Sequence, residues 1–231
     1  MYLFWKCMKA LATAVMLSGC LAASAGADLM LFAFENWAQA GEPVNLVEAG
    51  NMPARTRSEI RDIVRRIDQA FGNLSRGRYE EATAGFRYVL TMDPANKRAR
   101  FGLGNVLIQT GRYAEARDVF ERLVAEQPED FSLKNNLAWL YATAKDNAIR
   151  SGSRALELAQ QALMMAPTDH HVWSTLSESY YVLGQYKRAQ RAAQIALDLA
   201  APRPGTERSV VEYKRQLDKC QRAAEAMSII E

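Results

Sequence analysis

A short motif recurs at a fixed spacing, and this repeat constrains the fold of the 231-residue chain more than any other feature. The pattern G-R-Y-x-x-A begins at Gly77 and again 34 residues later at Gly111, and a related copy, G-Q-Y-x-x-A, begins at Gly184. A period of this size is typical of a solenoid, in which each helical unit buries its apolar face only by stacking on the next. The sequence therefore predicts a stack of helices, an architecture that usually forms interaction surfaces.

The residues around each copy follow a helical period. Gly77 is expected to end one helix, and residues 79–91 to form the next. Asp93 and Pro94 follow, and we expect Asp93 to cap a further helix that has Pro94 at its first position. The apolar stripe at i, i+3, i+4 spacing in the first helix comprises Ile60, Ile63, Val64, Ile67, Ala70, Phe71 and Leu74.

Residues 63–203 resemble four tetratricopeptide repeats, each made of a helix A, a tight turn and a helix B. The repeats cover 63–96, 97–130, 131–169 and 170–203, and the turn of the third is longer by five residues. The resemblance implies an all-α, right-handed superhelical solenoid of about four helix pairs within residues 57–203. It rests on Gly77, Tyr79, Ala82, Phe86 and Pro94, on Leu103, Gly104, Gly111, Tyr113, Ala116, Phe120 and Pro128, and on Trp173, Leu176, Tyr180, Gly184, Tyr186 and Ala189.

Residues 204–231 follow the last repeat and contain a further amphipathic helix. Its apolar side carries Tyr213, Leu217 and Cys220. A solenoid needs a capping element to cover its last exposed face. We therefore expect a C-terminal capping helix.

Residues 1–20 have the pattern of a secretory leader, with Lys6 and Lys9 before a short apolar stretch. The segment ends in L-S-G-C at Cys20, which resembles a bacterial lipobox. This resemblance implies a signal peptide and lipidation of Cys20. The predicted location is the bacterial cell envelope, anchored by lipid and facing the periplasm, and Leu21 after the cysteine slightly favours the outer membrane.

Two alternatives to lipidation remain open. Ala23-Ser24-Ala25 is an A-x-A site whose cleavage would release a soluble secreted or periplasmic protein. The uncharged residues 10–27 also just reach the length of a membrane anchor. Without lipidation, a disulfide between Cys20 and Cys220 becomes available.

Residues 21–56 combine a small-residue tether with an apolar segment, 29–37 (L-M-L-F-A-F-E-N-W). This segment is too apolar for a solvated linker. It is expected either to pack on the solenoid, in its groove or on its first helix, or to dock on a membrane or a partner.

The sequence contains no pattern that predicts an enzyme, a cofactor or a metal site. A phosphate-binding loop, HExxH, CxxC and G-x-S-x-G are all missing. His170 and His171 are adjacent, so on a helix they are expected to diverge by about 100°. Without Lys6 and Lys9, 27 basic residues face 26 acidic ones, and this balance gives no reason to expect a nucleic-acid partner.

The concave groove is the place where function is expected. In tetratricopeptide folds the A helices line this groove. Asn105 and Asn135 are predicted to hold the backbone of an extended peptide through their amides, while Phe101, Trp139 and Tyr181 provide anchor pockets. Of the cations that form a carboxylate clamp in chaperone-binding relatives, only Arg98 is placed to act. The predicted partner-binding residues are Phe71, Arg98, Phe101, Asn105, Ile108, Asn135, Trp139, His171, Glu178 and Tyr181.

These features together predict a non-catalytic adaptor that binds a protein or peptide within an envelope assembly, such as a secretion, pilus or cell-wall complex. The alternative is a self-associating or membrane-surface protein whose own N-terminal segment occupies the groove. Homo-oligomers are compatible with both.

Overall fold

The structure is a computed structural model, and it describes residues 57–230. The predictions for the leader, for Cys20 and for segment 29–37 therefore lie outside the described residues. The helices of the described range are α3 (Arg57–Ser75), α4 (Tyr79–Met92), α5 (Lys97–Gln109), α6 (Tyr113–Glu126), α7 (Phe131–Thr143), α8 (Gly152–Met165), α9 (His170–Val182), α10 (Tyr186–Ala200) and α11 (Glu207–Ile230).

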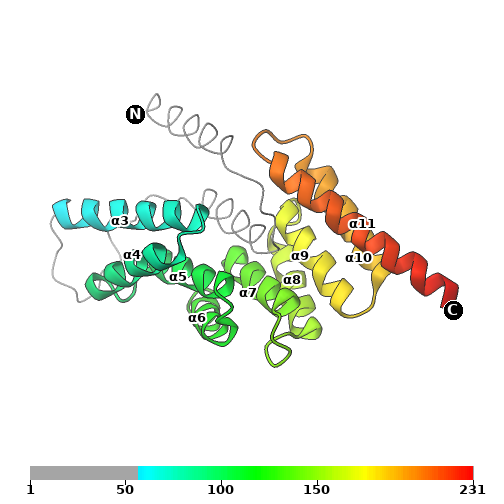
Figure 1. Cartoon of the computed structure of the whole chain (residues 1–231), viewed down its shortest axis with the longest axis horizontal. Helices are drawn as coiled ribbons and strands as arrows, with labels where there is room; N and C mark the ends of the chain where they lie inside the picture. Colours follow the sequence, from blue (N-terminus) through cyan, green and yellow to red (C-terminus); the bar gives the residue numbers. More distant parts are fainter. Residues whose placement is uncertain (1–56, 231) are drawn as a thin grey trace.

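The helices follow one another as antiparallel pairs along an arch, with α3 at one end and α11 at the other (Figure 1). Each pair packs its two helices together, and its second helix packs on the first helix of the following pair. Residues 57–230 contain no strand. The predicted all-α solenoid of four helix pairs with a closing helix is confirmed.

The three glycines of the recurring motif form the turns within pairs. Gly77, Gly111 and Gly184 have φ of 73°, 75° and 72°, a left-handed conformation that favours glycine. In each turn the glycine N–H donates to a carbonyl three residues earlier, as Gly111 does to Ile108 at 3.0 Å. The motif recurs because the same tight turn recurs.

The start of α5 differs from the prediction. Its N-cap is Asn96, whose side chain accepts a hydrogen bond from the N–H of Ala99 at 3.0 Å. Asp93 instead ends α4, and its carboxylate accepts from the amide of Asn96 at 3.0 Å. Pro94 lies in the turn between the helices. At the start of α9, by contrast, an aspartate is the N-cap: the Asp169 carboxylate accepts from the backbone N–H groups of His171 and Val172.

Two phenylalanines from B helices form the apolar wedge of the stack. Phe86 and Phe120 are fully buried. A Cβ added to Gly102 would lie 2.3 Å from the Phe86 ring, and one added to Gly104 would lie 2.9 Å from the Phe120 ring. These glycines let the backbone of α5 approach both rings closely, because a side chain would fill the same space.

The longer turn of the third pair, residues 144–151, is tied to the core. Ile149 is buried, and the N–H of Ser151 donates to the carbonyl of Tyr141 at 2.8 Å. Asp146 stabilises the turn by accepting from the N–H of Ala148 at 2.8 Å. The insertion therefore continues the packing between α7 and α8.

Candidate functional site

The predicted groove amides lie on α5 and α7, and they have unfilled hydrogen-bonding capacity. Asn105 is 1% exposed; its amide nitrogen donates to the carbonyl of Phe101 at 3.0 Å, while its Oδ1 has no partner among the described residues. Asn135 is 0% exposed, and neither atom of its amide has a hydrogen-bond partner within residues 57–230. A buried amide without partners is costly, by about 1–3 kcal/mol. A ligand that satisfies these atoms must first expose them, because both side chains are at most 1% exposed.

The apolar residues predicted beside them differ in burial. Trp139 is half-buried, and Phe101 and Ile108 are buried. The ring of Phe101 meets Phe120 edge-to-face at 5.8 Å between centroids. Phe71 is 2% exposed and stands edge-on to Phe86 at 4.9 Å. Phe71 thus belongs to the apolar core of the first pair.

The cation predicted to face the groove is paired. Arg98 donates to the carboxylate of Asp68 on α3 at 3.0 Å. This contact joins the A helices of the first and second pairs. It leaves the charge of Arg98 balanced within the solenoid.

The groove positions of the fourth pair are bound by the closing helix α11. Glu178 accepts from Lys219 at 2.7 Å and from the amide of Gln216 at 2.9 Å. The ammonium of Lys219 also lies 4.1 Å from the centre of the Tyr181 ring. The side chain of Glu178 is only 13% exposed. This part of the predicted surface is therefore an internal contact of the chain.

His170 and His171 meet the same hydroxyl on α11. The Nδ1 atoms of the two rings lie 2.9 Å and 3.0 Å from the Tyr213 hydroxyl. The ring centroids are 4.0 Å apart, so the rings do not diverge as predicted from their adjacency. Both side chains turn toward one partner that can donate and accept.

Three residues of this contact, Tyr213, Gln216 and Lys219, were not among those predicted for the site. Their spacing of three places them on one side of α11, and this periodicity is the sequence signal that could have identified them. The prediction treated α11 only as an apolar cap. It therefore missed a polar surface directed at α9.

Chemically reactive groups do not gather in the described part of the chain. Within residues 57–230, no group of three or more metal-ligating side chains comes together. Cys220 is 0% exposed and approaches the Ser177 hydroxyl at 3.6 Å. Burial raises the pKa of this thiol and so disfavours the nucleophilic thiolate.

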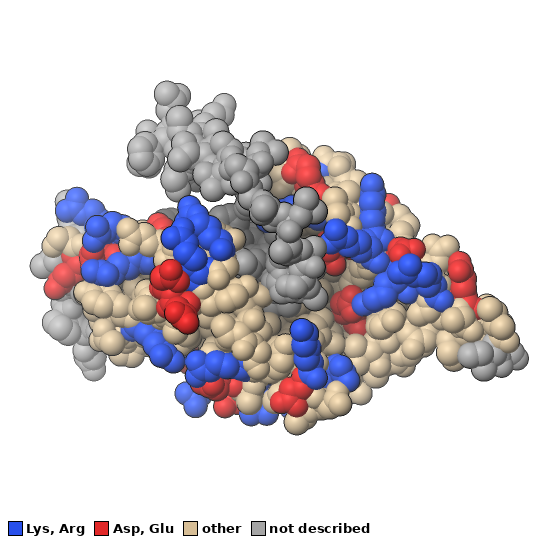
Figure 2. Space-filling model, viewed as in Figure 1, with Lys and Arg blue, Asp and Glu red and all other residues tan. Residues whose placement is uncertain are grey.

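The described surface carries mixed charge. On the face in Figure 2, Lys and Arg side chains are interspersed with Asp and Glu along the solenoid. Many are paired, as Arg100 is with Glu126 at 2.6 Å. This face differs from the single-sign stripe typical of a nucleic-acid surface. None of the helices in residues 57–230 is long and apolar enough to span a membrane.

Comparison with known proteins identifies the repeats. Two models described as tetratricopeptide repeat match residues 73–140 and 112–170. Human Protein O-mannosyl-transferase TMTC1 is 25% identical over 122 residues, which are 53% of this chain and 13% of that protein. The chain therefore spans only a small part of that relative.

Solved structures show the same fold. TTC0263, a thermophilic TPR protein of Thermus thermophilus, superposes with a TM-score of 0.57 at 22% identity, covering 72% of this chain and 90% of that one. MamA from Desulfovibrio magneticus gives a TM-score of 0.50 at 20% identity, covering 73% and 92%.

Proposed function

We propose that this chain, a carrier of tetratricopeptide repeats, is a non-catalytic adaptor that holds an extended segment of a partner protein on its concave face. A fold of stacked helix pairs supports the general role of a protein-interaction scaffold. The finer proposal concerns which part of the solenoid binds and what it recognises.

The unfilled amides of Asn105 and Asn135 carry the proposal. An extended peptide presents a donor and an acceptor at every residue, and a side-chain amide can satisfy both. Such contacts recognise backbone, so they hold a segment with little regard to its sequence. The neighbouring Trp139 is half-buried and offers an amphipathic anchor for an apolar side chain of the segment.

The closing helix limits where a ligand lies. Because α11 binds Glu178 and Tyr181, the proposed site is confined to α5 and α7. The ligand therefore contacts mainly the second and third pairs.

The groove is tested by replacing Asn105, Asn135 and Trp139 together with Ala. Proteins that co-purify with the full chain from gently solubilised envelopes are quantified by mass spectrometry, and helicity is measured by circular dichroism. We expect specific partners to be lost while helicity stays nearly unchanged.

The matched control replaces three exposed side chains of B helices, Arg87, Arg122 and Gln160, with Ala. It should retain the partners. Equal recovery from both triple variants would place binding away from the groove and contradict the proposal.

The envelope location rests on the lipobox at Cys20. We expect the Cys20→Ser chain to leave the membrane fraction, and the Cys220→Ser chain to remain in it. Mass spectrometry of the mature N-terminus should find a lipid on Cys20. A Cys20→Ser chain that stays membrane-bound would favour a retained anchor, and an unmodified N-terminus after Ala25 would favour soluble secretion.

The alternative function is self-association, in which residues 29–37 fill the groove of the same chain or of a second copy. The apolar character of that segment favours it. Sedimentation of residues 21–231 beside residues 57–231, with circular dichroism to verify folding of both, distinguishes the two. Oligomers that form only with the segment present would support self-association.

A further inference from the structure

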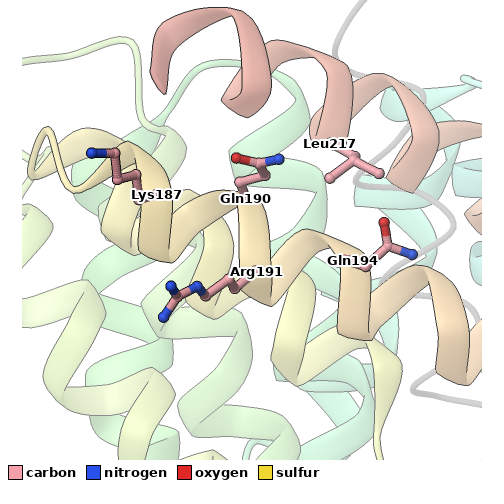
Figure 3. A pocket seen from close by; sticks show the side chains of 5 residues that line it. All are labelled: Lys187, Gln190, Arg191, Gln194 and Leu217. Atoms are coloured by element: carbon pink, nitrogen blue, oxygen red, sulfur yellow. The ribbon is translucent and has the colours of Figure 1, made fainter. Parts of the chain in front are cut away.

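We propose that the cleft between α10 and α11 is a second interaction surface, which binds an acidic segment of a partner protein. The cleft has a volume of about 310 Å³ and lies at the last junction of the solenoid. Figure 3 shows that α10 contributes Lys187, Gln190, Arg191 and Gln194, while Leu217 points toward α10 from α11.

The helix α11 occupies the place of helix A in a fifth pair. Counted from its first residue, Val210, Tyr213 and Leu217 stand at positions 4, 7 and 11. The same positions of α9 hold Trp173, Leu176 and Tyr180. In the four preceding pairs, a helix B packs on its helix A, but the described chain ends with α11.

The junction between α6 and α7, inside the solenoid, shows what fills the place that corresponds to the cleft between α10 and α11. Between α6 and α7, Glu121 and Tyr141 stand at the positions that Gln194 and Leu217 hold at the last junction. Arg154 of the following helix, α8, reaches both of them: its guanidinium lies 3.2 Å from the Tyr141 hydroxyl and 3.9 Å from the Glu121 carboxylate. The cleft at α10 and α11 is thus the position of a following helix.

The charges at the junction of α10 and α11 are the reverse of those at the junction of α6 and α7. There the following helix brings a cation to a carboxylate, whereas α10 itself brings the cations Lys187 and Arg191. Neither has an ion pair within the described chain, in contrast to Arg100 and Lys219. Carboxylates on the incoming segment would complement them. Because Lys187 and Arg191 are one helical turn apart, about 6 Å along the axis, two carboxylates at similar spacing fit best.

Lys214 argues against another repeat as the occupant. It stands at position 8 of α11, where the A helices α5, α7 and α9 have the buried small residues Gly104, Ala138 and Ser177. A long charged side chain at this crossing keeps a regular helix B from approaching. The same lysine adds a third cation, exposed on the face of α11 that carries Leu217. The surface therefore fits an acidic segment that lies along the cleft, with one apolar residue over Leu217.

The test uses the full chain and a synthetic peptide of about 18 residues, long enough for about five helical turns. The peptide carries two Glu residues four apart with a Leu between them, and its twin has Gln in place of Glu. Fluorescence anisotropy measures binding of each. We expect the Glu peptide to bind at least tenfold more tightly than the twin, and its affinity to fall with added salt.

Charge reversal locates the site. Lys187→Glu with Arg191→Glu should weaken binding of the Glu peptide at least tenfold and improve binding of a Lys version of it. The control, Arg87→Glu with Arg122→Glu, reverses two exposed cations of other B helices and should leave affinity within twofold. Equal binding of the Gln twin, or an equal loss in the control, would overturn the proposal. Binding of inorganic phosphate or anionic vesicles, without binding of the Glu peptide, would also overturn it and assign the cations to another ligand.

Discussion

The two ends of the solenoid are held together by different chemistry. From α3 to α8 one apolar cluster runs through the stack, with aromatic wedges between the helix pairs. At the other end the apolar clusters are small, and polar side chains of α11 bind α9: Gln216 and Lys219 to Glu178, and Tyr213 to two histidines. At this end the hydrogen bonds from α11 use the polar groups that α9 would otherwise present to a ligand. The predicted groove residue Glu178 on α9 is therefore engaged within the chain, whereas Asn105 and Asn135 on α5 and α7 keep amide atoms that the described residues leave unsatisfied.

The largest effect is expected from truncating an aromatic wedge. Phe86→Ala removes a fully buried ring and should lower the free energy of unfolding by about 3–5 kcal/mol, because the close-packed helices collapse only partly onto the cavity. Urea denaturation followed by circular dichroism measures the loss. Val211→Ala, a change at a half-exposed side chain, is the control and should stay within about 0.5 kcal/mol. A loss below about 1 kcal/mol at Phe86 would show that the wedge does not hold this end.

Substitution of Gly102, which lies against the Phe86 ring, tests the same contact. Gly102→Ala should lower the free energy of unfolding by about 1–3 kcal/mol, because the new methyl overlaps the Phe86 ring. The same substitution in the Phe86→Ala chain should cost less, since the methyl enters space that the ring has left. A double-mutant cycle from denaturation curves measures the coupling. Additive losses would contradict direct contact.

The polar end should respond locally. Glu178→Ala leaves Gln216 and Lys219 without their shared acceptor and should lower the free energy of unfolding by about 1–3 kcal/mol. It should also speed alkylation of the buried Cys220 on α11, measured on the Cys220 peptide by mass spectrometry. Phe86→Ala, under conditions where both chains remain folded, should change this rate less. An equal change in both would mean that the two ends open together.

The smallest effect is expected at the surface pair of Arg100 and Glu126. A hydrogen bond from Arg100 lowers the pKa of the Glu126 carboxyl below its usual value of 4.5. A lowered pKa in the folded state adds stability above the unfolded pKa, and this stability is lost as pH falls through the folded pKa. Because the carboxylate is half-exposed, Arg100→Met should cost less than about 1 kcal/mol near pH 7. The difference between the two chains should vanish in acid and shrink with salt, as thermal denaturation at several pH values will test. A difference that persists below the folded pKa would exclude this pair as its cause.

The sequence predicts the fold best at positions where only one residue type suits the local structure. The recurring glycines predicted tight turns, and Gly77, Gly111 and Gly184 form them; the motif positions of Phe86 and Phe120 are both fully buried. Capping was predicted less well: both Asp93 and Asn96 are good caps, and the length of the turn decides between them. The length of this turn cannot be read from Asp93 and Pro94 alone.

The candidate site was predictable only in part. Positions on A helices place Asn105 and Asn135 correctly on α5 and α7, because the helical period fixes them. The contacts of His171, Glu178 and Tyr181 could not be foreseen from α9 alone, since they depend on how α11 crosses it. The apolar stripe that identifies the cap does not include Gln216 and Lys219; their spacing of three places them on one side of α11 but does not name the residues of α9 that they meet.

The most direct measurement is photo-cross-linking in cells, with a photoreactive phenylalanine at Trp139 and, in a second chain, at the exposed Arg122. If the groove binds a peptide, position 139 should cross-link to a segment of another protein, and the cross-links should be lost when Asn105 and Asn135 are replaced with Ala. Position 122 should give none of these products. The same products from both positions, or none from position 139, would contradict a peptide-binding groove on α5 and α7. Cross-links from position 139 to residues 29–37 would instead establish the chain itself as the ligand.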